Sequence, residues 1–114
     1  MKKPLRMAVL SDTHFQAKTD GKDSFCWNVV RCSQSLASLS ALVDQLKTLD
    51  LDLILHLGDF TNDGSIKSFD DGMMGLKQVG VPVHVVRGNH DTGPVQRRLA
   101  DPQGRIDQTF VVND

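Results

Sequence analysis

The segment LILHLGDFTNDG, residues 53–64, constrains the fold of this chain more than any other. It begins as an unbroken apolar run and stops at Gly58-Asp59, which is typical of a short strand buried on both faces. An acid directly after such a strand lies at its carboxyl end, the edge of an open parallel sheet where ligands bind. The segment therefore predicts a central strand and a functional carboxylate, Asp59.

Two other segments repeat this pattern of an apolar run followed by polar, chemically active residues. MAVLSDTH occupies residues 7–14, and the apolar residues 81–86 run through Arg87 into GNHD at residues 88–91. If the three strands are parallel neighbours, their ends meet at one edge of the sheet. The groups that would gather there are Asp12, His14, Asp59, Asn89 and His90. Mixed oxygen and imidazole donors suit Mn, Zn, Fe or Co rather than Ca.

The segments between the strands have helical patterns. Leucine and valine residues spaced three and four apart predict one amphipathic helix over residues 33–49, with its stripe at Leu36, Leu39, Val43 and Leu46. A second helix is expected over residues 65–79, capped by Ser65 or Ser68 and stopped by Gly80. Gly72 and Gly75 weaken this second helix.

The order of elements predicts the fold class. Strands are expected over residues 5–10, 51–57, 81–86 and 109–112, a short helix over 94–100 and a turn over 102–107. Alternating strands and helices favour right-handed crossovers and a mostly parallel α/β sheet with flanking helices. His56 and His84 fall within strands and are interpreted as core or face residues. Asp63 follows the middle strand and is interpreted as a residue that caps the turn.

Composition bounds the possible partners. The 114 residues fit one domain, and a formal net charge of −1 gives no bulk electrostatic attraction to nucleic acid or to a membrane surface. The spacing of Cys26 and Cys32 matches no zinc or redox motif, so free thiols are expected. The apolar run near the N-terminus is too short for a signal peptide, and no stretch reaches transmembrane length. We therefore expect a cytoplasmic protein.

Three motifs in order, each after an apolar run, carry a family resemblance. They are D-x-H at residues 12–14, G-D-x4-G at residues 58–64 and G-N-H-D at residues 88–91. Together they resemble the motifs of the calcineurin-like metallophosphoesterase superfamily. Their residues are most similar to those of its cyclic-nucleotide and glycerophosphodiester phosphodiesterase branch. Asp63 and Asp91 stand where the serine/threonine protein phosphatases have arginine and glutamate. The chain also has no tyrosine to serve as the phenolate ligand of purple acid phosphatases.

The resemblance implies a site for two divalent metal ions. By resemblance Asp59 bridges the ions, Asp12 and His14 complete the shell of the first, and Asn89 ligates the second. Because Asp12 and His14 alternate on what is expected to be an extended segment, both side chains can point the same way.

The resemblance also implies a reaction. A hydroxide that bridges the two ions would attack the phosphorus of a phosphodiester, or of a phosphomonoester, in line. His90 would stabilise the phosphoryl oxygen or protonate the leaving alkoxide, and Asp91 would orient its imidazole.

The sequence departs from the family pattern in its last part. The resemblance covers roughly residues 5–92, and the later lone histidine and Gly-His-x-His motif of the family have no match, because no histidine follows His90. We expect residues 1–114 to be the N-terminal portion of such a domain, half of a two-sheet sandwich and a piece of a longer enzyme. An uncovered sheet edge and apolar face predict self-association.

Two other functions remain open. The first is a scaffold or binding module that keeps the metallophosphoesterase fold without catalysis, which the missing histidines favour. The second is an unrelated nucleotide-binding α/β domain. The sequence argues against it because it has no glycine-rich loop of the kind that binds phosphate.

Overall fold

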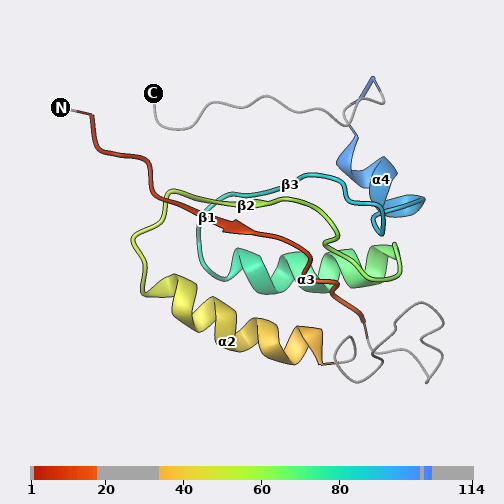
Figure 1. Ribbon diagram of the computed structural model, residues 1–114, viewed down its shortest axis with the longest axis horizontal. Coiled ribbons are helices and arrows are strands. Elements are labelled where there is room, and N and C mark those ends of the chain that lie inside the picture. Colours follow the sequence, from red (N-terminus) through yellow and green to blue (C-terminus); the bar gives the residue numbers. More distant parts are fainter. Residues whose placement is uncertain (1, 18–33, 101, 104–114) are drawn as a thin grey trace.

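In the computed structural model, residues 2–17, 34–100 and 102–103 are described, and within them strands and helices alternate (Figure 1). The elements are β1 (Met7–Leu10), α2 (Ser35–Lys47), β2 (Leu53–His56), α3 (Ile66–Lys77), β3 (Val83–Val85) and α4 (Pro94–Leu99). This order confirms the predicted α/β class. The expected strand over residues 109–112, most of the turn over 102–107, and both cysteines lie outside the described residues. No helix in the described ranges is long and apolar enough to cross a membrane.

The three strands form one parallel sheet in the order β1-β2-β3. Ala8 lies opposite Ile54, and Ile54 lies opposite Val83, so the strands run in register and end at the same edge. The central strand is the most buried: Leu53, Ile54 and His56 are each at most 1% exposed. The apolar run of the middle segment therefore forms the buried strand that it predicted.

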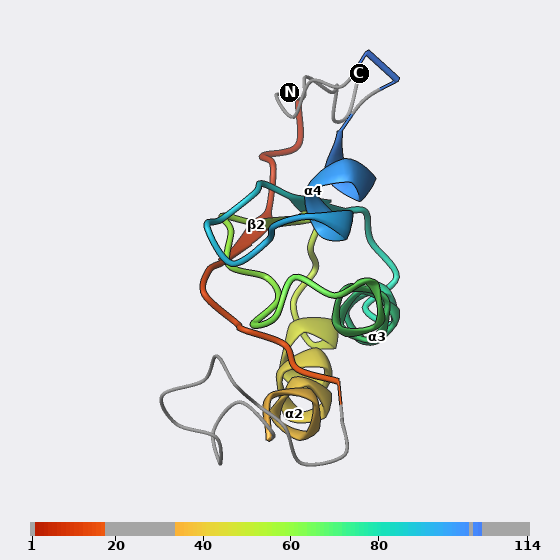
Figure 2. The same cartoon turned by 90° about the vertical axis from the view of Figure 1, so that its right-hand side faces the viewer.

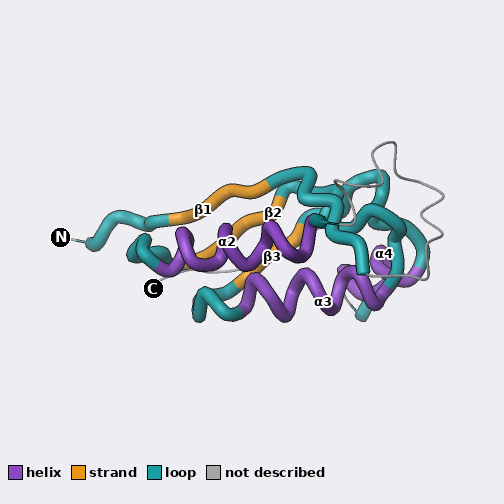
Figure 3. Tube along the Cα trace, turned by 90° about the horizontal axis from the view of Figure 1, so that it is seen from below, coloured by secondary structure: helices purple, strands orange, loops and turns teal. Residues whose placement is uncertain are grey.

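The helices α2 and α3 lie on the same side of the sheet (Figures 1 and 3), and Figure 2 looks along both of them. The face of α2 that packs inward carries Leu39, Val43 and Leu46, which confirms the predicted stripe. Together with Ile54 and Val85 these residues belong to the hydrophobic core. The core supports the strands from one side and leaves their carboxyl ends free for chemistry.

Helix α3 starts where its cap predicts and packs unusually closely. The Ser65 hydroxyl accepts a hydrogen bond from the Ser68 N–H at 3.1 Å, so Ser65 is the N-cap. A Cβ atom at Gly72 would lie 2.5 Å from the Phe15 ring and 2.8 Å from the Phe60 ring. The glycine weakens the isolated helix, but it lets α3 approach the two rings that lie beneath the site.

Strand β1 is only half covered. Ala8 and Leu10 pack against the core, whereas the alternate residues Met7 and Val9 are 43% and 51% exposed. Leu57 and Val86, just beyond β2 and β3, are also about half exposed. Parallel sheets are normally covered on both faces, so these side chains mark an apolar surface available for contact with other protein.

Candidate metal centre

The loop after β1 runs beside the loop after β2 and extends the parallel pairing of the two strands. The N–H groups of Asp12 and His14 donate to the carbonyl oxygens of Gly58 and Asp59, each at 3.0 Å. Phe15 then forms an isolated parallel bridge with Thr61. These backbone bonds bring Asp12, His14 and Asp59 together, although more than forty residues separate Asp59 from the other two.

The backbone at these three residues is strained. The φ angles are 55° at Asp12, 46° at His14 and 50° at Asp59, the only residues other than glycine with positive φ in the described part of the chain. The left-handed region costs such residues roughly 1–2 kcal/mol each, and strain of this kind clusters at functional sites. The expected extended geometry of Asp12 and His14 is therefore wrong. Their side chains nevertheless lie near each other, with both residues in the region of positive φ.

Two glycines let the loops after β2 and β3 touch. A Cβ atom at Gly58 would lie 2.9 Å from the backbone nitrogen of Gly88, and one at Gly88 would collide with the backbone and carboxylate of Asp59. Because neither glycine has a side chain, the His90 N–H reaches Oδ1 of Asp59 at 2.9 Å. The close approach places Asn89 and His90 against Asp59.

Asp91 fastens these two loops from inside. Its side chain is fully buried, and Oδ1 accepts hydrogen bonds from the N–H and hydroxyl of Thr61 at 2.8 and 2.9 Å. Oδ2 accepts from the N–H groups of Phe60 at 3.1 Å and Gly88 at 2.9 Å. The expectation that Asp91 orients the His90 imidazole is wrong, because both of its oxygens are committed to the loops.

The His90 imidazole is oriented instead by a backbone group. Its Nδ1 lies 2.9 Å from the carbonyl oxygen of Asn62. A carbonyl oxygen only accepts, so Nδ1 carries a hydrogen, and Nε2 is the ring nitrogen left for other partners. The ring meets that of His14 edge to face, with centroids 4.6 Å apart. Sequence analysis missed Asn62 as a positioning group because the contact uses its main chain.

The side chains form a group with the chemistry of a metal site. The ligand atoms of His14, Asp59 and His90 all lie within 4.8 Å of one another. His14 Nε2 is 3.8 Å from Asp59 Oδ2 and 3.9 Å from Asp12 Oδ1. Imidazole nitrogens beside carboxylate oxygens are donors that first-row divalent ions accept, so the residues present fit a metal ion here.

Asn89 lies against the same carboxylate. With its amide turned so that the nitrogen faces Asp59, it donates to Oδ2 at 3.1 Å and to Oδ1 at 3.2 Å. With the carbonyl oxygen facing Asp59, acceptor is set against acceptor, an arrangement that a cation between the two groups would stabilise. Asn89 therefore lies where a metal ligand is expected. Its amide can donate to Asp59 in one orientation and can offer its oxygen to a cation in the other.

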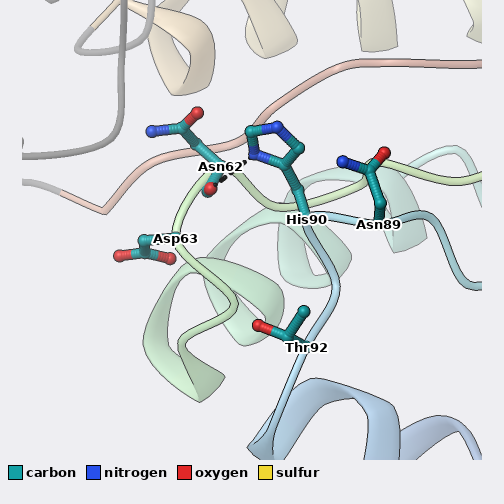
Figure 4. Close-up of a pocket in the computed structure, with 5 residues that line it drawn as sticks. All are labelled: Asn62, Asp63, Asn89, His90 and Thr92. Carbon is teal, nitrogen blue, oxygen red and sulfur yellow. Dashed lines mark hydrogen bonds between the residues drawn. The ribbon is translucent and has the colours of Figure 1, made fainter.

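A cavity of about 290 Å³ opens beside this group and is lined by Asn62, Asp63, Asn89, His90 and Thr92 (Figure 4). Asp63 accepts hydrogen bonds from the Ser65 N–H and from Gln16, each at 3.0 Å, which confirms that it caps the turn. Burial raises the pKa of Asp63, but bonds from Ser65, Ser68 and Gln16 outweigh burial and hold the pKa below its usual value. One wall of the cavity is therefore anionic.

His56 supports the site from beneath, a role that sequence analysis did not assign. It is fully buried, as predicted for a core residue. Its Nδ1 accepts from the Gly58 N–H at 3.2 Å, so Nε2 carries the hydrogen that points to the Thr13 hydroxyl at 3.0 Å. Thr13 in turn donates to the Phe60 carbonyl at 3.1 Å. Burial lowers the pKa of His56 from 6.5 to about 4, so the ring is neutral. The other strand histidine, His84, is partly buried on β3.

Comparison with known proteins agrees with this geometry. The model of the calcineurin-like phosphoesterase family matches residues 5–112, so the chain belongs to that family. Among solved structures, a dimetal phosphatase from Danio rerio superposes with a TM-score of 0.60 at 22% sequence identity. The match covers 90% of this chain and 38% of the phosphatase, so the chain spans well under half of that protein. No curated protein matches the sequence.

Replacing Asp59 should separate metal binding from backbone strain. We expect Asp59→Ala and Asp59→Gly both to lose Mn²⁺ binding in calorimetric titration, whereas Asp44→Asn on the exposed face of α2 keeps it. Because only glycine tolerates positive φ freely, Asp59→Gly should be about 0.5–1 kcal/mol more stable than Asp59→Ala in urea unfolding with chelator. Equal stability of the two variants would show that this residue is not strained.

His56 should make unfolding depend on pH. Its pKa is depressed in the folded protein, so its contribution to stability is complete above the ordinary value of 6.5 and is lost as pH falls towards about 4. Between about pH 7.5 and about pH 5 the free energy of unfolding should fall by about 2 kcal/mol more in the wild type than in His56→Gln. Urea titrations in chelator measure this difference, and parallel curves for the two proteins would contradict the assignment.

Proposed function

We propose that this site hydrolyses phosphodiesters with the help of divalent metal ions, Mn²⁺ among them. The observation that supports this most is the convergence of His14, Asp59 and His90 at one edge of the sheet, with ligand atoms within 4.8 Å of one another. The family to which the chain belongs comprises calcineurin-like phosphoesterases. We further propose that the protein acts in the cytoplasm, where thiols such as Cys26 and Cys32 remain reduced.

In this proposal the described residues provide three ligands for one ion and two for a second ion. Asp12, His14 and Asp59 would hold the first ion. Asn89 and the other oxygen of Asp59 would hold the second. Ions bound there supply Lewis acidity and lower the pKa of water, which provides a nucleophile at neutral pH.

The protein groups around the ions have separate tasks. Asn89 lies at the open side of Asp59, where its amide can orient a phosphoryl oxygen. A protonated His90, with Nδ1 held by the Asn62 carbonyl, presents its Nε2 hydrogen to the phosphoryl or leaving oxygen. The anionic Asp63 and the hydroxyl of Thr92 line the cavity where the organic part of the substrate would lie.

A catalytically incomplete scaffold is the second candidate. It is favoured by the second ion position, for which Asp59 and Asn89 are the two oxygen donors that this proposal assigns among the described residues. Such a protein would keep the first ion and bind a phosphate group without cleaving the ester.

Hydrolysis of bis(p-nitrophenyl) phosphate distinguishes the two functions. With added Mn²⁺ the wild-type chain should release p-nitrophenol, and Asp59→Ala should reduce the rate by at least about a hundredfold because it removes a ligand shared by both ions. Chelator should abolish the activity and Mn²⁺ should restore it. A folded wild-type protein whose rate equals that of Asp59→Ala would favour the scaffold.

We also propose that the chain self-associates through the exposed apolar residues of β1. Met7 and Val9 lie on one face of β1, 43% and 51% exposed. Among the described residues β1 is an edge strand, and an edge strand presents unpaired backbone groups to another chain. A second copy would cover both the apolar side chains and the edge.

Light scattering measures this association. The wild type should be a dimer or larger, and Val9→Lys should be a monomer because a charge on the shared surface is costly to bury. Asp44→Lys, which places the same side chain on the exposed side of α2, should remain associated. A wild-type monomer at high concentration would rule out the proposal.

A further inference from the structure

We propose that the groove between α3 and α4 is a docking site for a partner protein, and that it binds a helix with one apolar face flanked by acidic residues. The groove has a volume of about 490 Å³ and shares no lining residue with the cavity beside the metal centre. The proposal is therefore independent of the hydrolysis proposed above.

One side of α3 forms the long wall of the groove. The residues on this wall recur at spacings of three and four, so they share one side of the helix. They are Phe69, Asp70, Met73, Met74 and Lys77. From the first to the last the wall follows about two turns of α3, or about 12 Å. Arg98 of α4 lines the opposite wall, and α4 lies beside α3 on the side away from α2 (Figures 1 and 2).

The apolar part of the lining has a fixed floor and an adaptable rim. Phe69 is buried, and its ring lies against that of Phe60 with centroids 5.2 Å apart, so the core holds it in place. Met73 is partly buried, whereas Met74 is 67% exposed. Methionine side chains are flexible and recur at surfaces that bind apolar partners. An exposed methionine above a buried ring is thus suited to close over an apolar side chain of a partner.

The charges around the groove favour an acidic partner. Arg98 pairs with Asp70 at 2.9 Å, which joins the two walls. Among the residues that the structure describes, no carboxylate forms an ion pair with Lys77 or with the neighbouring Arg97. The lining therefore keeps a positive charge in excess, although the whole chain has a net charge of −1. Acidic side chains beside the apolar face of a partner would complement this charge.

A helix fits this groove better than an extended segment. Both walls are helical, and their backbone groups pair within each helix, so the groove offers no row of donors and acceptors to an extended chain. A helix satisfies its own backbone and presents apolar side chains at every third or fourth position. Two turns of such a helix match the length of the wall on α3.

Synthetic peptides of about 20 residues, long enough to form a helix, test the proposal on the 114-residue protein. One peptide carries leucine at every third or fourth position with glutamate beside each leucine, and the other has lysine in place of glutamate. In fluorescence anisotropy the wild type should bind the glutamate peptide with a Kd of about 100 µM or below. It should bind the lysine peptide at least about tenfold more weakly.

Substitutions in the groove locate the binding. Met74→Ser should weaken binding of the glutamate peptide at least about tenfold, and the exposure of Met74 means that the core stays intact. Lys77→Glu should weaken it at least about fivefold and should strengthen binding of the lysine peptide. Lys47→Glu is the matched control, because Lys47 also lies in the last turn of its helix and the change in net charge is the same. This variant should bind both peptides as the wild type does.

Three results would overturn the proposal. The first is equal affinity of the wild type and Met74→Ser for the glutamate peptide, and the second is equal affinity of the wild type for both peptides. The third concerns a different occupant: if Met74→Ser converts a wild-type assembly into monomers in light scattering, a second copy of the chain fills the groove. The peptide results remain interpretable if no phosphodiester is cleaved, because they do not depend on activity.

Discussion

The buried carboxylate of Asp91 is the interaction on which the site depends. A charged group away from water is stable only when hydrogen bonds replace its hydration, and Asp91 finds four donors on Phe60, Thr61 and Gly88. These donors belong to the loops that follow β2 and β3. Satisfying the carboxylate therefore locks the loops together, and with them Asp59, Asn89 and His90.

The loops after β1 and β2 carry backbone strain that this arrangement sustains. Asp12, His14 and Asp59 all have positive φ, and their N–H and C=O groups are held by bonds between the first two strand ends. Gly58 and Gly88 remove the Cβ atoms that would keep the loops apart. The backbone contacts thus hold the side chains of the candidate metal centre in place, which is the usual advantage of a preorganised site.

The edge of the sheet has two sides with different roles, one that holds the backbone and one that faces the cavity. The inner side is buried, and there His56, Thr13 and Asp91 hold the backbone through hydrogen bonds. On the outer side, the Asp63 carboxylate, the His90 imidazole and the amides of Asn62 and Asn89 line a cavity of about 290 Å³. Membership of the calcineurin-like phosphoesterase family agrees with the metal-binding chemistry that we propose for the outer side.

Much of this architecture could be predicted from local patterns. Apolar runs that end in polar motifs predicted the three parallel strands, and the spacing of Leu39, Val43 and Leu46 predicted the buried face of α2. The meeting of Asp59 with His14 and His90 followed from the rule that parallel strands end at one edge. Each of these features depends on residues close in sequence or on a general property of sheets, so no detailed packing was needed.

The partners of individual groups were decided by tertiary structure alone. Asp91 is adjacent to His90 in sequence, yet its side chain turns inward to donors about thirty residues away, while His90 is held by the carbonyl of Asn62. The pairing of Thr13 with His56 and the left-handed backbone at Asp12 and His14 likewise arise where the segment after β1 meets β2 and the loop that follows it. The sequence by itself determined which chemical groups reach this edge. Their tautomers, strain and hydrogen bonds were decided by the contact of loops distant in sequence, because main-chain donors and acceptors are the same in every residue and leave no mark in the sequence.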